Sequence, residues 1–320
     1  MNNLKPSKSE LIKLLEYFNS ERYKEAEILA LSITEKFPNH PFGWKILGSI
    51  LRKEGKVSEA LFFNKKAVKL DPEDANAHNN LGNNLNDLSR LVEAEESYRQ
   101  AIILNPNFAE AYFNLANMFS NQGRLNEAKE NYSKAIDIKP DYISALENLG
   151  NVFSRLSDFD KAEVSYNKAI LLNPVKSSLL NNLGALLRKL GRLDEAELYN
   201  RRAVAIKPDF ATAYNNLGNT LADLNKPDEA EKIYRQAISL NPNYIDAHCN
   251  LGNLLRGIGR LDEAEISYRQ AINIQSDFDL ALVNLGLVEL KKGKHKEGLK
   301  NLRSGSGSIL FDINIGVSIK

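Results

Sequence analysis

Asparagine recurs in two columns along the chain, and its side-chain amide can hydrogen bond to a peptide group in two ways. The first column has one asparagine in each of seven successive segments of 34 residues: Asn80, Asn114, Asn148, Asn182, Asn216, Asn250 and Asn284. The second column lies three residues further along in five of these segments: Asn83, Asn117, Asn151, Asn219 and Asn253. With two donors and one acceptor, such an amide can hold the N–H and the C=O of a bound chain, whatever side chains that chain carries. The columns therefore predict a ladder of carboxamides that grips an extended peptide.

The two columns are expected to share one face of a series of helices, because residues three apart on a helix are neighbours. Asparagine is a mediocre helix former, so its repetition within helices needs a reason beyond local propensity. Peptide binding is one reason, and hydrogen bonding between neighbouring helices is the alternative. Ala185 interrupts the second column near its middle.

Charged residues follow one helical turn further along: Arg52, Lys53, Arg155, Arg188, Lys189 and Arg256, against Asp87 and Asp223. The excess of basic residues favours an acidic or carboxylate-bearing peptide, and ordinary solvated charge is the other explanation. We place Arg155, Arg188 and Lys189 in the candidate peptide-binding site together with the asparagines.

Other reactive side chains give no pattern that indicates catalysis. The single Cys249 cannot form an intramolecular disulfide, and the four histidines lack the spacing of zinc ligands. His78 and His248 occupy a position held elsewhere by Trp44, so we expect them to pack. No nucleophile motif or phosphate-binding loop is present, so we expect no enzyme, no metal and no cofactor.

The charge balance argues against partners that a protein attracts through a large net positive charge. The 42 lysine and arginine residues nearly cancel the 41 aspartate and glutamate residues, which leaves a net charge of +1. Nucleic acids and acidic membranes are therefore not expected partners. The start of the chain lacks the layout of a secretory signal, and no run of about 18 apolar residues occurs. We expect a soluble, cytoplasmic protein.

The elements that position the asparagines follow from a strict period of 34 residues. It is marked by prolines at Pro38, Pro72, Pro106, Pro140, Pro174, Pro208 and Pro242. Apolar residues at helical spacing predict a first helix that breaks at Gly257–Gly259 in one such unit, and a second helix with Asp262 as its N-cap. Steps such as Asn105–Pro106 predict the turns between units.

Small residues recur in step with the prolines, among them Gly82, Gly218, Gly252, Ala94 and Ala101. Their repetition predicts close packing of the two helices, where a larger residue costs about 1–3 kcal/mol. Pairs such as Glu231 and Arg235, four residues apart, are expected to form a soluble outer face.

The pattern resembles the tetratricopeptide repeat, whose Leu-Gly pair matches Leu81-Gly82, Leu149-Gly150, Leu217-Gly218 and Leu251-Gly252. The resemblance implies an all-α, right-handed superhelical solenoid with the first helix of each pair on its concave surface. Residues 41–278 form seven repeats, 1–40 an N-terminal tail with a degenerate capping repeat, and 279–303 a degenerate C-terminal repeat. Three residues depart from the pattern on the second helices: Asn64 and Asn200 replace tyrosine, and Gly298 replaces alanine. Gly298 should weaken its helix by about 0.5–1 kcal/mol.

The asparagine columns are similar to those of the superhelical repeat domain of O-linked N-acetylglucosamine transferases, where concave asparagines hold an extended substrate. The resemblance implies a non-enzymatic scaffold that binds an extended peptide segment of a partner protein. The alternative is the substrate-recruiting module of a glycosyltransferase-like system whose catalytic domain is absent or on another chain. Assembly by end-to-end stacking is a third possibility.

The last segment, 304–320, is expected to be a Gly/Ser linker and a strand-like tail, because Ile309, Phe311 and Val317 alternate with polar residues. An isolated strand needs a partner. We hypothesise that the tail docks on an apolar groove end formed by Leu280, Val283, Leu287 and Leu290, in its own chain or in a second copy. The alternatives are a mobile tail or the stub of a longer architecture.

Overall fold

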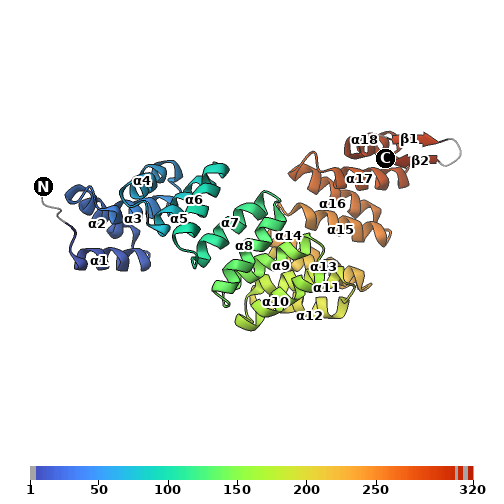
Figure 1. Cartoon of the computed structure of the whole chain (residues 1–320). Helices are drawn as coiled ribbons and strands as arrows, with labels where there is room; N and C mark the ends of the chain where they lie inside the picture. The colour runs from blue at the N-terminus through green and yellow to red at the C-terminus, as the bar shows by residue number, and fades with distance from the viewer. Residues whose placement is uncertain (1–4, 307–308, 313–315, 320) are drawn as a thin grey trace. The chain divides into compact units, whose positions relative to one another are not determined.

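The computed structural model describes residues 5–306, 309–312 and 316–319, and side chains as far as Gly305. The chain divides into two compact units, Met1–Asp158 and Phe159–Lys320, each of which is treated by itself. Within each unit, antiparallel helices form pairs, and each pair packs against the next pair in the sequence (Figure 1). The expected all-α solenoid of helical repeats is confirmed.

In this article the A helix is the first helix of a pair and the B helix is the second. The first unit contains α1 (Lys8–Asn19), α2 (Tyr23–Lys36), α3 (Pro41–Lys53), α4 (Val57–Leu70), α5 (Ala75–Asp87), α6 (Leu91–Leu104), α7 (Ala109–Asn121), α8 (Leu125–Ile138) and α9 (Ile143–Arg155). The second unit contains α10 (Phe159–Leu172), α11 (Ser177–Lys189), α12 (Leu193–Ile206), α13 (Ala211–Asp223), α14 (Pro227–Leu240), α15 (Ile245–Gly257), α16 (Leu261–Ile274), α17 (Asp279–Lys291), α18 (His295–Ser306), β1 (Ile309–Asp312) and β2 (Gly316–Ile319). Odd-numbered helices are A helices, and even-numbered helices are B helices.

The turn from A helix to B helix contains one residue in the left-handed region, as Gly259 shows with φ of 85°. Glycine adopts this conformation without steric cost, which explains the predicted break at Gly257–Gly259. The expected N-cap is wrong, however, because α16 begins at Leu261 and Arg260 occupies the N-cap position without a side-chain capping bond. The backbone N–H of Arg260 donates to the carbonyl of Leu255 at 2.9 Å, and this bond closes the reversal two residues before Asp262.

The glycine of each A helix allows the following B helix to approach closely, as the repetition predicts. A Cβ atom added to Gly218 would lie 2.6 Å from the ring of Tyr234, and one added to Gly252 would lie 2.7 Å from the ring of Tyr268. The B-helix alanines Ala94 and Ala101 are fully buried. The small residues are therefore packing residues, and a larger side chain would overpack the helix pair.

The turns between repeats follow the predicted X–Pro steps, and Asn105 is extended before Pro106. A ring nitrogen on the A helix secures this turn in three repeats. Nε2 of His78 and of His248 each lie 2.9 Å from the carbonyl oxygen of the proline six residues earlier, and Nε1 of Trp44 lies 3.1 Å from that of Pro38. Because a carbonyl only accepts, these nitrogens donate. The two histidines hold the turn, in agreement with the expected packing role.

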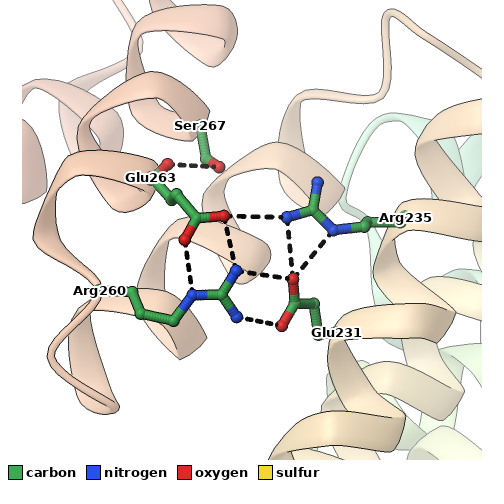
Figure 2. A network of polar contacts seen from close by, with 5 residues as sticks. All are labelled: Glu231, Arg235, Arg260, Glu263 and Ser267. Atoms are coloured by element: carbon green, nitrogen blue, oxygen red, sulfur yellow. Dashed lines mark hydrogen bonds and ion pairs between the residues drawn. The ribbon is translucent and has the colours of Figure 1, made fainter.

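The charged pairs on the B helices do more than form a soluble face. Figure 2 shows Glu231 of α14 between Arg235, four residues along, and Arg260, which precedes α16. Arg260 also pairs with Glu263 at 2.6 Å, so a single guanidinium joins two successive repeats. Arg192 bridges Glu163 and Glu195 in the same way. The pairs within each helix are visible in the sequence, but these bridges are not, since their partners lie 29 residues apart.

Helices α17 and α18 approach each other closely at Gly286 and Gly298. A Cβ added to Gly298 would lie 2.9 Å from the carbonyl oxygen of Gly286, so α18 could not take alanine there without moving. The expectation that Gly298 only weakens its helix is therefore incomplete, because this glycine makes the close approach possible. A Cβ added to Gly305 would similarly meet Val283 at 3.0 Å.

This packing also involves two residues of the expected groove end. Leu290 lies near Gly298 and Val283 lies near Gly305, so both contact α18, whereas Leu280 is 51% exposed. In the same repeat Glu289, at a position where other A helices carry Leu85 or Leu255, is fully buried. Its carboxylate accepts from Arg269 at 2.7 Å and from Asn301 at 2.8 Å, which provides the partners that a buried charge requires.

The C-terminal segment is a hairpin in the described residues. β1 pairs antiparallel with β2, with Ile309 opposite Ile319, so the described part of the expected strand-like tail is two paired strands. Helix α18 continues to Ser306, into the segment interpreted as a linker. Side chains beyond Gly305 lie outside the described residues, so docking of the tail stays a prediction. Among the described residues, no helix has the length and apolar character required to cross a membrane.

Candidate peptide-binding site

Amides of the first column hydrogen bond to the preceding A helix. Nδ2 of Asn114, Asn216 and Asn250 donates to Oδ1 of Asn79, Asn181 and Asn215, respectively, at 3.0, 2.9 and 3.0 Å. Asn80 donates to Oγ of Ser49 at 3.2 Å, and Asn148 donates to Oδ1 of Asn117 at 2.8 Å. The alternative role considered for these residues, bonding between neighbouring helices, is thus present in the structure.

Amides of the second column accept a hydrogen bond from a tyrosine of the B helix in the same pair. The hydroxyls of Tyr98, Tyr132, Tyr234 and Tyr268 donate to Oδ1 of Asn83, Asn117, Asn219 and Asn253, respectively, at 2.8, 2.5, 2.7 and 2.8 Å. Burial raises the pKa of Tyr132 and of Tyr268 to about 12, so these hydroxyls keep their protons at neutral pH. Each of these tyrosines therefore fixes the orientation of one amide.

These internal bonds leave a defined set of polar atoms unused. In the second unit, Oδ1 of Asn216 and Asn250 and Nδ2 of Asn219 and Asn253 have no hydrogen-bond partner among the described residues. None of them belongs to the fully buried atoms without a partner, so they are accessible to solvent. The first column thus presents acceptors and the second column presents donors.

Asparagines of these columns line cavities in both units. The cavity in the first unit has a volume of about 390 Å³ and is lined by Asn80 and Asn83. The cavity in the second unit has a volume of about 470 Å³ and is lined by Asn219, Asn250 and Asn253. Rungs of the predicted ladder therefore line hollows in the surface of both units.

Other asparagines of the two columns differ in burial. Asn151 on α9 and Asn182 on α11 are half-buried and lie in different units. Asn284 on α17 is only 7% exposed. Burial of Asn284 limits its access to a ligand, and the accessible acceptors and donors named above lie on α13 and α15.

The basic residues beside the columns are partly neutralised. Arg188 pairs with Asp223 and Arg52 pairs with Asp87, both at 2.6 Å and both between successive A helices. Arg155 donates to the carbonyl and the hydroxyl of Ser120 at 3.0 and 3.2 Å. Lys189 is exposed at the end of α11. Asp87 and Asp223 therefore neutralise Arg52 and Arg188, and the basic excess at this level of the A helices is carried by other residues such as Lys189.

The sequence contained a signal for these internal bonds that the asparagine columns alone do not reveal. Tyrosine occurs on the B helix in the same five repeats that carry a second-column asparagine, with Asn64 and Asn200 opposite Ser49 and Ala185 in the other two. A buried hydroxyl needs an acceptor, which accounts for the co-occurrence. Three of the residues that accept hydrogen bonds from the first column are also visible in the sequence, because each directly precedes a column asparagine: Asn79-Asn80, Asn181-Asn182 and Asn215-Asn216.

Side chains that could support other chemistry are engaged or buried. Cys249 is a free, buried cysteine, and burial raises the pKa of its thiol to about 12, which disfavours the reactive thiolate. Within the part of the chain that the structure describes, no three His, Cys, Asp or Glu residues come together as a metal site. The expected inertness of Cys249 agrees with its burial.

Helix pairs of constant length, glycine-to-tyrosine packing and a repeated polar face define a helical-repeat protein of the interaction-scaffold type. Family models of the tetratricopeptide repeat match residues 48–86, 75–108, 97–130, 116–157, 148–209 and 209–277. Together these matches cover most of the chain. The chain belongs to the tetratricopeptide-repeat family.

Solved structures share this fold at low sequence identity. A chain of the APC/C hetero-tetramer Cut9–Hcn1 is 19% identical with a TM-score of 0.64, and the match covers 90% of this chain and 57% of that one. A tetratricopeptide-repeat protein of Parabacteroides merdae is 20% identical with a TM-score of 0.64, and the match covers 73% of this chain and 93% of that one.

A curated relative matches over a short segment. The protein O-mannosyl-transferase Tmtc3 of Drosophila melanogaster is 42% identical over 52 residues, which are 16% of this chain and 6% of that protein. The chain thus corresponds to a small fraction of the length of this relative.

Proposed function

We propose that the protein is a non-enzymatic scaffold that binds an extended segment of a partner protein along the two asparagine columns. The orientation of the amides in the second unit is the observation that carries this proposal. A peptide group has one donor and one acceptor, and the columns present the complementary acceptors of Asn216 and Asn250 beside the donors of Asn219 and Asn253. The tetratricopeptide-repeat architecture is itself suited to protein interaction.

The hydrogen bonds within the protein support binding instead of opposing it. Because Tyr234 and Tyr268 hold Asn219 and Asn253 in place, these amides lose little rotational freedom when a ligand binds. Each hydrogen bond to a peptide contributes about 0.5–1.5 kcal/mol net. Ordering the bound segment costs about 1–2 kcal/mol per residue, so we expect micromolar or weaker affinity from backbone recognition alone.

A double variant that removes the outward donors of the second column separates ligand binding from fold stability. In the double variant Asn219→Asp/Asn253→Asp, each new carboxylate still accepts from its tyrosine hydroxyl, while the two outward N–H donors are lost. We expect selection from a display library of random peptides to yield ligands for the wild-type protein that bind this variant at least tenfold more weakly, since about 1.4 kcal/mol corresponds to tenfold. Stability in urea should change little.

The matched control is Asn131→Ala on α8, because Asn131 lies outside both columns and donates to the carbonyl of Glu127 in its own helix. The selected peptides should bind this control as they bind the wild-type protein. Equal affinity of the Asp double variant and the wild-type protein would assign the columns to architecture alone.

Further parts of the proposal concern the setting of the protein. We infer a cytoplasmic location, since a reducing compartment suits the single buried thiol of Cys249. The surface of the asparagine columns would also suit a module that recruits substrates to a glycosyltransferase on another chain. A transfer assay that compares the wild-type protein with the Asp double variant tests this alternative. Self-association through the C-terminal segment is tested by sedimentation of the chain with and without residues 307–320.

A further inference from the structure

The cavity of the first unit exists at a repeat that lacks the tyrosine. In α4, Asn64 occupies the position of Tyr98, Tyr234 and Tyr268, and in α3 Ser49 occupies the position of their asparagine acceptors. The shorter side chain of Asn64 packs against Gly48, where an added Cβ would lie 2.1 Å from its Oδ1. Space that an aromatic ring fills in the repeats with tyrosine is thus left open, and both Ser49 and Asn64 line the cavity of about 390 Å³.

The amide of Asn64 is buried with unused hydrogen-bonding capacity. Asn64 is 1% exposed, and neither its Nδ2 nor its Oδ1 has a hydrogen-bond partner in the described part of the chain. The equivalent Asn200 in α12 differs at its nitrogen: Nδ2 donates to Oγ1 of Thr220 at 3.1 Å, and Oδ1 alone is without a partner among the described residues. Asn84 stands in the place of Thr220 beside Asn64, but it donates to the carbonyl of Val57 at 2.8 Å instead. A buried amide of this kind is costly unless a ligand satisfies it.

The walls of the cavity define the shape and charge of the missing group. Leu15, Phe18, Phe42 and Ile46 supply apolar surface. The cationic Nζ of Lys53 lies 5.6 Å from the ring centroid of Phe18. Lys45 and Arg52 also line the cavity, but they pair with Asp74 and Asp87, and the carboxylate of Glu110 lines the cavity as well. The charges at the rim therefore largely cancel and do not select a charged side chain. A group with an apolar, flat body and a tip that both donates and accepts fits these conditions.

We propose that the cavity binds a tyrosine side chain of the partner segment, with its hydroxyl directed at the amide of Asn64. The inference rests on the proposed function, since Asn80 and Asn83 of the ladder line the same cavity and would hold the backbone beside that tyrosine. A phenol hydroxyl can donate to Oδ1 and accept from Nδ2 of one amide. A carboxamide such as glutamine could make the same bonds but would leave the apolar wall uncovered.

The test uses the full chain and single amino-acid amides, so it does not require a peptide that binds the ladder. N-acetyl-tyrosinamide is titrated into isotope-labelled protein, and NMR follows the side-chain amide of Asn64. We expect saturable shifts, and about tenfold weaker binding of N-acetyl-phenylalaninamide and of N-acetyl-glutaminamide, because each lacks one part of the match.

Variants then assign the preference to Asn64. Asn64→Leu should remove the preference for tyrosine over phenylalanine, whereas Asn200→Leu, at the equivalent position of the second unit, should preserve it. The double variant Ser49→Asn/Asn64→Tyr rebuilds the tyrosine–asparagine pair of the other repeats, so it should raise the unfolding temperature and abolish binding even if Asn64→Leu folds poorly.

Absence of saturable binding, equal binding of the three amides, or an unchanged preference in both Asn64 variants would overturn the proposal. The peptide selection distinguishes this failure from failure of the proposed function. Selected peptides that depend on Asn219 and Asn253 but show no enrichment in tyrosine would support the scaffold and refute the tyrosine pocket.

Discussion

The hydroxyl of Tyr234 donates a hydrogen bond to Oδ1 of Asn219 at 2.7 Å, and this contact joins the B helix α14 to its own A helix α13. The ring of the same tyrosine packs on Gly218, the residue before Asn219. One side chain therefore fixes both the spacing of the helix pair and the orientation of an amide in the candidate site. The two roles can be separated by removing the hydroxyl alone.

We predict that Tyr234→Phe lowers the stability of the protein by about 0.5–1.5 kcal/mol, the net value of one hydrogen bond. The ring contacts with Gly218 persist, so the helix pair should still form. Urea unfolding followed by circular dichroism measures the effect. Tyr199→Phe is the matched control, because the Tyr199 hydroxyl makes no hydrogen bond to any described residue. A loss of equal size in both variants would show that the hydroxyl bond does not contribute.

Gly298→Ala is predicted to destabilise the last helix pair, although alanine favours helices. The added Cβ would lie 2.9 Å from the carbonyl oxygen of Gly286 and from Leu290, so overpacking of about 1–3 kcal/mol should exceed the helix gain of about 0.5–1 kcal/mol.

The control for this prediction is Gly257→Ala at the end of α15, where an added Cβ meets nothing within 4 Å. This substitution should leave the unfolding temperature unchanged or raise it. A rise of that temperature in Gly298→Ala as well would mean that α17 and α18 separate without cost.

The ion-pair cluster around Glu265 predicts a loss of stability in acid. Burial acts to raise the pKa of Glu265, but hydrogen bonds from Lys292, Lys294 and Arg269 outweigh it and lower the pKa to about 2. Because the folded pKa lies below the usual value of 4.5, the contribution of Glu265 is complete above that value. It is lost progressively as the pH falls from about 4.5 toward about 2.

Thermal unfolding over this pH range tests the prediction with Glu265→Gln. The wild-type protein should exceed the variant in unfolding temperature at neutral pH, and the difference should shrink as the pH falls toward about 2. Glu73→Gln, at an exposed position that makes no ion pair among the described residues, is the control and should follow the wild-type curve. A constant difference between wild type and Glu265→Gln would contradict the assignment.

The guanidinium of Arg260 is predicted to couple α14 and α16 in a salt-dependent manner (Figure 2). A double-mutant cycle of Arg260→Gln and Glu231→Gln should give a favourable coupling at low ionic strength, which decreases in concentrated NaCl because exposed charges are screened. Urea unfolding of the four proteins measures the coupling. Coupling that is independent of salt would indicate packing of the side chains instead of charge.

The period of the sequence determined the helix pairs, their turns and the small residues between them. Because the same spacing recurs, each repeat must bury the same positions, and Gly82, Gly218 and Ala94 could be assigned to the packing surface before any coordinates. The period also placed the asparagines on one face of the A helices. Periodicity gives these results because it reports which residues share a face of a helix.

Only the tertiary structure decided where the polar groups of those asparagines are directed. Asn216 donates to a residue 35 positions away and Asn219 accepts from one 15 positions away, and such distances are set by the stacking of helices. The same holds for the cavity beside Asn64 and for the bridges of Arg260, which depend on what a neighbouring helix presents. Local sequence fixes the face of each side chain, but its hydrogen-bond partner is chosen by residues that only folding brings within reach.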